Sequence, residues 1–398
     1  MMNEVKSLDT EIKGLTDALR GQRILHLSAT ANGGGVAEIL RSEVPMLQDL
    51  GIKADWQVIE PPAGFFEVTK KIHNALQGEH TGLSPTEWRY YEAVSKDMAK
   101  KVAPAQWDAI IVHDPQPAAI PYFRVDASDT KWIWRCHLDS SDPHGGVANR
   151  MAKYLLPYAG GIFSLESFRL PGFSPEHLAI IPPAIDADSK KNRPMDKDEA
   201  QEILRAYPLD LSRPFVVQVS RFDQWKDPLG VLEAWRLAKQ KVSELQLALV
   251  GDTADDDPQA PMIVKELRGA AKGDDGLLIL VDEADDRTVK AFQTLAVAAV
   301  QKSLREGFGL SVTEALWAGT PVIASNVGGI PLQIEEGRNG YLVSTIPKAA
   351  DRMAELAADP AKAKRMGTAG RKIVEEKFLM PRLVRDDLTL VAKVLGAD

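Results

Sequence analysis

Short apolar runs alternate with longer segments of helical periodicity along almost the whole chain. In the first half, strands are predicted at the runs RILHLSA, ADWQVIE, DAIIVHD, KWIWRCH, GIFSL and AIIPPAI. Helices are predicted between them at residues 36–50, 65–76, 85–102 and 151–158, and an amphipathic helix precedes them within residues 1–20. Strands that alternate with helices indicate right-handed crossovers and a mainly parallel sheet.

The pattern changes at residues 181–194, where IPPAIDADSKKNRP lacks periodicity and predicts an interdomain linker. Strands then resume at FVVQVS, LQLALVG, LLILV, AVAAVQ and PVIAS, with a helix at residues 228–240 between the first two. We therefore expect an α/β protein with two Rossmann-like, doubly wound domains, residues 1–190 and 195–380. A last helical segment, within residues 381–398, is expected to pack back on the first domain. Because open α/β sheets bind ligands at the carboxyl ends of their strands, functional residues should gather in an interdomain cleft.

Composition narrows the classes of partner. The chain has 398 residues, and its charge of 48 − 56 = −8 disfavours nucleic acid or an anionic membrane as the partner, although a few basic residues would suffice for a small anionic ligand. The single cysteine, Cys136, excludes an intramolecular disulfide and a multi-cysteine metal site. The chain shows neither a membrane-spanning run nor a secretory signal, so a cytoplasmic location is expected. Residues 255–257, three aspartates, are interpreted as a solvated loop, and no metal is expected.

A glycine triplet, Gly33, Gly34 and Gly35, follows the first strand and precedes a helix. Glycine lets backbone N–H groups approach an anion, and the helix N-terminus adds partial positive charge. A plain glycine-rich turn remains the alternative. Glu38 stands where the third glycine of a dinucleotide fingerprint belongs, which disfavours an oxidoreductase.

Two cations, Arg221 and Lys226, follow the first strand of the second domain in VSRFDQWKD. At the carboxyl end of that strand they could neutralise a diphosphate whose negative charge grows as its bond to a sugar breaks. The alternative is a solvated loop with ordinary charges.

The most informative segment is Arg305–Gly329. Glu306 follows a strand, Gly307 and Gly309 come next, and a helix is predicted from Leu310 to Trp317 with Glu314 inside it. Carboxylates suit sugar hydroxyls because each accepts several hydrogen bonds. In the alternative interpretation, Glu306 and Glu314 are surface residues of a loop and a helix.

Polar residues also follow two strands of the first domain. The residues concerned are His113, Asp114 and Gln116 after one strand, and Arg135, His137 and Asp139 after the next. Dense polar clusters at strand ends can read an array of sugar hydroxyls, so these residues are candidates for acceptor binding, with His137 also a catalytic candidate.

The segment from Glu306 to Glu314 resembles the E-x7-E signature of retaining GT-B glycosyltransferases of the glycogen-synthase and sucrose-synthase kind. The resemblance implies that Glu306 contacts the hydroxyls of the donor sugar and Glu314 the ribose. It further implies a diphosphate site made of the backbone near Gly307, Phe308, Gly309 and Leu310 with Arg221 and Lys226, supplemented by Gly34 and Gly35.

The segments VHDPQPAAIP and WRCHLDSSDP of the first domain contain His113 and His137. Together with PPAID and KKN near the linker, they are similar to the glycosyl-transferring trehalose synthases and the retaining trehalose phosphorylases. The length suits the synthases. Asp142 and His144 depart from the expected pattern after His137, which puts the choice of acceptor in doubt.

The resemblance implies a retaining hexosyltransferase that moves glucose from a nucleoside-diphosphate glucose, such as UDP-glucose, to glucose and forms α,α-trehalose. His137, Glu306, Arg221 and Lys226 would carry catalysis, without metal or cofactor, in a protein that could form a homodimer. Three alternatives stay open. They are transfer to glycerate, glycerol or glycerol phosphate, phosphorolysis of trehalose, and a non-catalytic nucleotide-sugar sensor.

Overall fold

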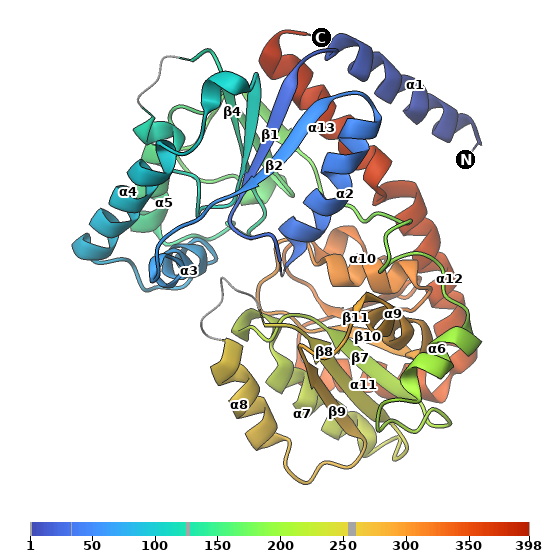
Figure 1. Ribbon diagram of the computed structural model, residues 1–398. Coiled ribbons are helices and arrows are strands. Elements are labelled where there is room, and N and C mark those ends of the chain that lie inside the picture. Colours follow the sequence, from blue (N-terminus) through green and yellow to red (C-terminus); the bar gives the residue numbers. More distant parts are fainter. Residues whose placement is uncertain (1, 33, 125–127, 254–259, 398) are drawn as a thin grey trace. The chain divides into compact units, whose positions relative to one another are not determined.

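The computed structural model describes residues 2–32, 34–124, 128–253 and 260–397, which fall into two compact units (Figure 1). Within the described ranges, unit 1 comprises residues 2–184 and 380–397, and unit 2 comprises residues 185–253 and 260–379. Each unit contains one six-stranded sheet in which all pairings are parallel.

In unit 1 the sheet has the strand order β2-β1-β3-β4-β5-β6. Its strands are β1 (Arg23–Ser28), β2 (Lys53–Val58), β3 (Ala109–His113), β4 (Lys131–Cys136), β5 (Gly160–Phe163) and β6 (His177–Ile180). The α-helices of this unit are α1 (Met2–Ala18), α2 (Gly35–Asp49), α3 (Phe65–Leu76), α4 (Pro85–Ala99), α5 (Gly145–Tyr154) and α13 (Met380–Leu395). Short 3-10 helices occupy Pro104–Gln106, Pro121–Phe123 and Glu166–Phe168.

The two faces of this sheet differ in chemistry, because alternate residues of a strand point to opposite faces. One face carries apolar residues such as Val112, Trp132 and Trp134, which form a core with the residues of α3, α4 and α5. The other face carries polar residues, including His26, His113 and Arg135, and helices α2 and α13 pack beside it. A polar interior therefore lies on one side of the unit 1 sheet.

In unit 2 the strand order is β12-β11-β10-β7-β8-β9. The strands are β7 (Phe215–Val219), β8 (Gln246–Gly251), β9 (Leu277–Val281), β10 (Ala298–Gln301), β11 (Val322–Ser325) and β12 (Gly340–Val343). The α-helices are α6 (Lys197–Leu204), α7 (Pro228–Lys239), α8 (Ala260–Ala270), α9 (Asp286–Leu295), α10 (Leu310–Trp317), α11 (Ile346–Ala358) and α12 (Pro360–Lys377), with 3-10 helices at Gln224–Lys226 and Ile330–Leu332. Separate apolar clusters pack on the two faces of this sheet, as expected for a doubly wound domain.

The predicted fold class is confirmed, and three details differ. Strand β12 was not predicted, and α5 begins at Gly145 rather than at residue 151. The segment expected to be an interdomain linker is largely part of a unit, because its residues from Ile185 onward group with unit 2. The Ile185 N–H donates to the Phe378 carbonyl at 2.9 Å. At the other end, α13 packs against α1 and α2 within unit 1.

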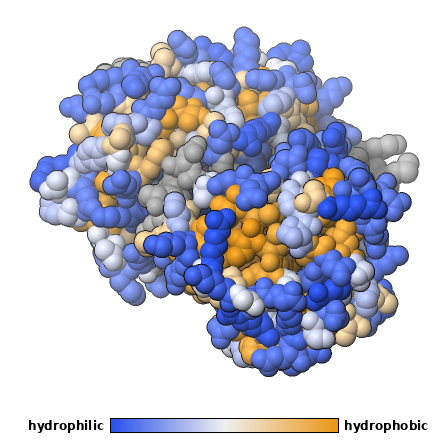
Figure 2. Space-filling model, turned by 60° about the horizontal axis from the view of Figure 1, so that its bottom comes forward, coloured by the Kyte–Doolittle hydropathy of each residue, from blue (hydrophilic) through white to orange (hydrophobic). Residues whose placement is uncertain are grey.

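The surface view in Figure 2 is mostly hydrophilic, with one apolar area that stands out. Large apolar side chains that are exposed among the described residues are Leu156, Ile180, Met262, Leu304 and Leu332. Of the helices within the described ranges, none combines the length and the apolar character needed to cross a bilayer.

Candidate functional site

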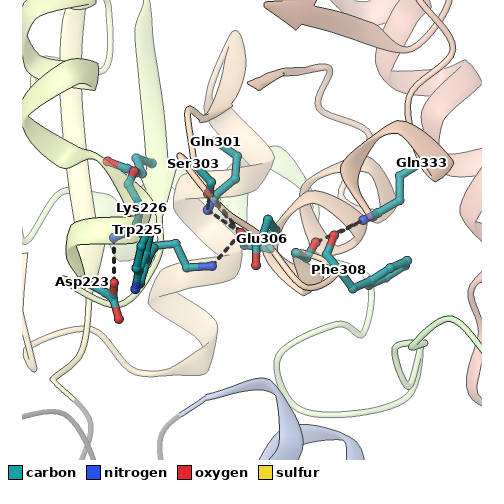
Figure 3. Close-up of polar contacts among 11 residues, drawn as sticks. Asp223, Trp225, Lys226, Gln301, Ser303, Glu306, Phe308 and Gln333 are labelled. Carbon is teal, nitrogen blue, oxygen red and sulfur yellow. Dashed lines mark hydrogen bonds and ion pairs between the residues drawn. The ribbon is translucent and has the colours of Figure 1, made fainter. Parts of the chain in front are cut away.

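The centre of the unit 2 site is the carboxylate of Glu306, which lies in the loop between β10 and α10 (Figure 3). Its Oε2 atom forms an ion pair with Lys226 Nζ at 2.6 Å and accepts a hydrogen bond from Ser303 Oγ at 3.0 Å. Gln301 Nε2 lies 3.5 Å from the same oxygen. These contacts fix the carboxylate of Glu306 in a buried position, with the side chain 8% exposed.

The loop conformation around Glu306 requires glycine at neighbouring positions. At Gly328, where φ is +54°, a Cβ atom would lie 1.6 Å from the carbonyl oxygen of Glu306. At Gly329, a Cβ atom would lie 2.7 Å from the carbonyl oxygen of Gly307, to which the Gly329 N–H donates a hydrogen bond at 3.1 Å. The segment after β11 therefore packs directly on the backbone of the Glu306 loop.

Helix α10 begins where the sequence predicts, immediately after this loop. Its N-cap residue, Gly309, has the left-handed conformation with φ of 86° and supplies no side-chain cap. The Gln333 side chain holds the loop by donating to the Phe308 carbonyl at 2.7 Å (Figure 3). It also accepts from Thr313 at 2.6 Å. The first N–H groups of α10 consequently follow a turn with permissive backbone, the arrangement that favours binding of an anion.

Lys226 owes its position to the turn after β7. The Asp223 carboxylate accepts from the Trp225 N–H at 2.7 Å, and Gln218 donates to the Lys226 carbonyl at 2.9 Å. Asp227 caps α7 and forms an ion pair with Lys302. The sequence assigned Lys226 and Glu306 to different parts of a donor molecule, whereas the structure brings them into direct contact.

Arg221 lies in the same turn and is half-buried. It follows β7 by two residues, as predicted.

Glu314 occupies a different environment from Glu306, inside α10. It is 1% exposed and forms an ion pair with Lys191 Nζ at 2.8 Å, so the alternative interpretation as a surface residue is wrong. The linker segment is further tied to α10 by Trp317, which donates to the Asn192 carbonyl at 2.9 Å. Burial lowers the pKa of Lys290 to about 8, although the Glu314 carboxylate acts in the opposite direction.

The glycine turn of unit 1 caps α2. Gly34 is the N-cap residue with φ of 88°, where no side chain accepts from the helix, and α2 starts at Gly35. Gly33 lies outside the described residues. The expected helix N-terminus after β1 is present.

The histidines of unit 1 lie together. His113 Nδ1 and His137 Nε2 are 3.0 Å apart, and the two rings are stacked at a centroid distance of 5.3 Å. Asp114 adopts φ of 64° and accepts from the His137 backbone N–H at 2.8 Å. Burial lowers the pKa of both imidazoles well below the ordinary value. A neighbouring basic side chain lowers each pKa further: His137 acts on His113, and Arg135 acts on His137. These rings are therefore neutral at pH 7.

The remaining candidates of unit 1 are buried in different ways. Arg135 does not reach solvent, because its guanidinium forms an ion pair with Asp387 of α13 inside the unit. Asp139 accepts from the hydroxyl of Ser141 at 2.5 Å. Gln116 is 6% exposed, and its Oε1 atom has no hydrogen-bond partner within the described part of the chain. Strand alternation explains the burial of Arg135, which shares the inward face with His113.

The departures at Asp142 and His144 also have structural explanations. The ring of His144 caps α5, because its Nδ1 atom accepts from the Val147 N–H at 3.3 Å. The backbone N–H of His144 donates to the Ala75 carbonyl at 2.8 Å. Asp142 is exposed in the turn before that helix. His144 thus serves the start of α5.

Several residues of these networks could not be recognised from the sequence. Ser303 and Gln301 surround Glu306, Lys191 pairs with Glu314, and His26 joins the histidine pair of unit 1. Only the KKN string near the linker pointed to Lys191. Among the described residues, no group of three or more His, Cys, Asp or Glu side chains is arranged to hold a metal ion. The aspartates at 255–257 lie outside the described residues.

Comparison with known proteins decides the family. Residues 26–170 match the family model for the trehalose synthase N-terminal domain, and residues 199–373 match that for glycosyl transferases group 1. A trehalose synthase from Rubrobacter xylanophilus is 44% identical over 396 residues, which cover 98% of this chain and 95% of that protein. The chain belongs to the trehalose synthase family. A second trehalose synthase, from Pyrococcus horikoshii, is 38% identical over 97% of this chain and 94% of that protein.

More distant similarities agree with this membership of the trehalose synthase family. A trehalose phosphorylase from Pleurotus pulmonarius is 27% identical, over 91% of this chain and 56% of that enzyme. The fold resembles sucrose-phosphate synthase from Thermosynechococcus elongatus, with a TM-score of 0.71 at 18% identity, covering 95% of this chain and 100% of the other. It also resembles an α,α-trehalose-phosphate synthase from Burkholderia xenovorans, with a TM-score of 0.72 at 14% identity, covering 93% and 100%. The chain is a GT-B glycosyltransferase, and it is a hexosyltransferase acting in trehalose metabolism.

Proposed function

We propose that this enzyme transfers glucose from a nucleoside-diphosphate glucose to free glucose with retention of configuration, forming α,α-trehalose. The observation that carries the proposal is the 44% identity to a trehalose synthase over 98% of the chain. The charged network around Glu306 supports it, because the network offers both a carboxylate for a sugar and a cation, Lys226, for a diphosphate.

The donor would be held by unit 2. Glu306 keeps one carboxylate oxygen, Oε1, outside its contacts with Lys226 and Ser303, and this oxygen can accept from hydroxyls of the donor sugar. Arg221, Lys226 and the first N–H groups of α10 would neutralise the diphosphate. Glu314, which lies beside Lys191, would accept from the ribose hydroxyls.

The reaction would be a front-face substitution. The oxygen of the acceptor hydroxyl bonds to the anomeric carbon on the side that the diphosphate vacates, and the electron pair of the broken C–O bond stays with the diphosphate. The proton of the hydroxyl passes to the departing phosphate oxygen. A nucleoside diphosphate is a good leaving group once its charge is stabilised, so the protein contributes positioning and electrostatics.

Unit 1 would bind the acceptor. Asp114, Gln116 and Asp139 lie just after the carboxyl ends of its strands, and His137 would orient the reacting sugar. His113 is not part of the acceptor site, because it is buried and both of its ring nitrogens contact neighbouring histidines. Arg135 is not part of this proposal, because Asp387 already occupies its guanidinium inside the unit.

The direct test is to incubate the protein with UDP-, ADP-, GDP-, CDP- and TDP-glucose, each with glucose, glycerol, glycerate or glycerol phosphate. NMR of the product identifies the linkage. We expect α,α-trehalose from glucose with at least one donor, and transfer only to a three-carbon acceptor would overturn the proposal.

Two controls separate the remaining activities. Trehalose with inorganic phosphate is assayed for glucose 1-phosphate, and phosphorolysis without synthesis from any nucleotide sugar would identify a phosphorylase. Binding of the nucleotide sugars without turnover of any acceptor would identify a sensor.

A further inference from the structure

Three imidazole rings of unit 1 form a single file. His26 Nδ1 lies 3.1 Å from His113 Nε2, and His113 Nδ1 lies 3.0 Å from His137 Nε2. Consecutive rings are stacked, with centroid distances of 5.4 and 5.3 Å. His26 and His113 are buried, while His137 is half-buried.

The parallel sheet creates this file. His26 lies on β1, His113 ends β3, and His137 directly follows β4, and these strands are neighbours in the order β1-β3-β4. The register pairs His26 with Ile111 and His113 with Arg135, so the histidines share one face of the sheet. Each ring is therefore fixed by a different strand.

Neutral imidazole has one N–H donor and one bare acceptor nitrogen, so each N···N contact needs one proton. All three rings are neutral at pH 7. Burial lowers the pKa of His26 to about 4, and it lowers those of His113 and His137 well below the ordinary value. His113 takes part in both contacts. With a proton on both of its ring nitrogens it would be a cation, and with a proton on neither it would be an anion, so a neutral His113 donates in one contact and accepts in the other.

Only two arrangements remain, because every contact joins Nδ1 of one ring to Nε2 of the next. Either all three rings carry their proton on Nδ1, or all three carry it on Nε2. In the first arrangement, His137 keeps an N–H donor at Nδ1. In the second, it keeps a bare acceptor there.

We propose that His26 and His113 are positioning residues that hold His137 in their own tautomer and thereby decide whether its Nδ1 donates or accepts a hydrogen bond. The rings then act as one unit with a single choice of state. The part of this inference that concerns a sugar at His137 rests on the proposed function, whereas the shared tautomer does not.

The far end of the file is closed. His26 Nε2 is buried and has no hydrogen-bond partner among the residues that the structure describes. Asp387 and Arg135 act on the ring with opposite sign, since the carboxylate raises the pKa of His26 and the guanidinium lowers it. Changing the tautomer requires a proton at His26 Nε2 to be added or removed, so the buried end opposes the exchange.

The test is NMR of the full-length protein labelled with ¹⁵N-histidine, whose seven histidines give few signals. The two ring nitrogens of a neutral histidine are far apart in frequency when one tautomer is populated, and they converge when both exchange. We expect His26, His113 and His137 to show the same single tautomer. His80→Phe, at an exposed position, is the control and should leave these signals unchanged.

Variants test the direction of the coupling. In His113→Leu the His137 nitrogens should shift towards each other, because its tautomer is no longer constrained. In His26→Leu the signals of His113 and His137 should still report one common tautomer. His113→Gln, whose amide offers a donor and an acceptor, should restore separated His137 signals.

Opposite tautomers of His26 and His137 in the unmodified protein would overturn the inference, and so would His137 signals that do not respond to His113→Leu. If His113→Leu does not fold, the unmodified protein and His26→Leu still decide. Transferase assays are run separately, so loss of the proposed function with a shared tautomer is distinguishable from failure of this inference.

Discussion

At the residue scale, the contact between Lys226 and Glu306 concentrates opposite charges at one point of unit 2. Lys226 and Ser303 both donate to Oε2 of Glu306, so the carboxylate has a fixed orientation before any ligand arrives. Preorganised charge of this kind costs little reorganisation during a reaction. Substitution of Glu306 therefore tests directly whether this fixed carboxylate contributes to the reaction.

Glu306→Gln should lower kcat/KM for glucosyl transfer by about 10- to 100-fold, since hydrogen bonds to a charged group contribute roughly 1.5–3 kcal/mol. The amide keeps the shape and removes the charge. Steady-state kinetics with the preferred donor measures the effect. Glu233→Gln, at an exposed position of α7, should keep full activity. Unchanged transfer by Glu306→Gln would remove this residue from the donor site.

Motif spacing could predict Glu306 because its glycines and the following helix have a recognisable local pattern. The same logic could not predict His26, since a histidine inside an apolar strand looks like any satisfied core histidine. It also mislocated Arg135. Position near a strand end indicated a ligand-facing side chain, whereas the partner that buries Arg135 lies 252 positions away.

At the element scale, the loop after β10 and the turn after β11 are built as one unit. Gly328 and Gly329 allow the two backbones to touch, and Gln333 joins the loop to the same turn. The conformation of the loop before α10 therefore depends on a segment some twenty residues later in the chain.

Gly328→Ala should disturb this packing, because its Cβ would overlap the Glu306 carbonyl and φ is positive. The matched control is Gly337→Ala, where φ is +73° and nothing lies within 4 Å of the added atom. A left-handed residue with a side chain costs roughly 1–2 kcal/mol. We expect that loss for Gly337→Ala in urea unfolding, and a larger loss together with weaker donor binding for Gly328→Ala. Equal effects of the two substitutions would contradict the packing argument.

Most elements followed from periodicity, and the exceptions have local causes. Strand β12, GYLV, begins with a glycine and has only three apolar residues. Helix α5 begins early because the ring of His144 caps it, whereas Gly145 and Gly146 signal a turn. Such caps depend on the geometry of a side chain, which the spacing of apolar residues along the sequence does not reveal.

At the scale of the whole molecule, the chain leaves unit 1 after Ala184 and returns to it at Met380. The returning helix α13 inserts Asp387 beside Arg135 in the polar interior. Burial raises the pKa of Asp387 to about 8, Arg135 opposes this, and the neighbouring Glu43 carboxyl adds to it. Periodicity predicted the return of a helix, but no local signal named its partner on β4.

The raised pKa predicts a pH dependence of stability. The folded state binds the Asp387 proton up to about pH 8, while an unfolded aspartate releases it near pH 4. The contribution of Asp387 to stability therefore falls as pH rises from 5 to 8. Asp387→Asn removes this dependence. The melting temperature of the variant minus that of the unmodified protein should therefore increase from pH 5 to pH 8.

Asp108→Asn is the control for that experiment. The hydrogen bond from Arg23 lowers the pKa of Asp108, so this carboxyl titrates below the range studied. Its variant should show a constant offset from pH 5 to 8. A constant offset for Asp387→Asn as well would exclude the buried titration.

The return of α13 also sets an order of events during synthesis. The described residues of unit 2, 185–253 and 260–379, all precede α13 in the sequence, so they leave the ribosome before it. Unit 1 lacks the carboxyl group that accepts from Arg135 until α13 emerges, and until then this guanidinium lacks its hydrogen-bond partner on that helix. The elements of unit 1 that are translated first consequently gain this helix only after the residues of unit 2 have been made.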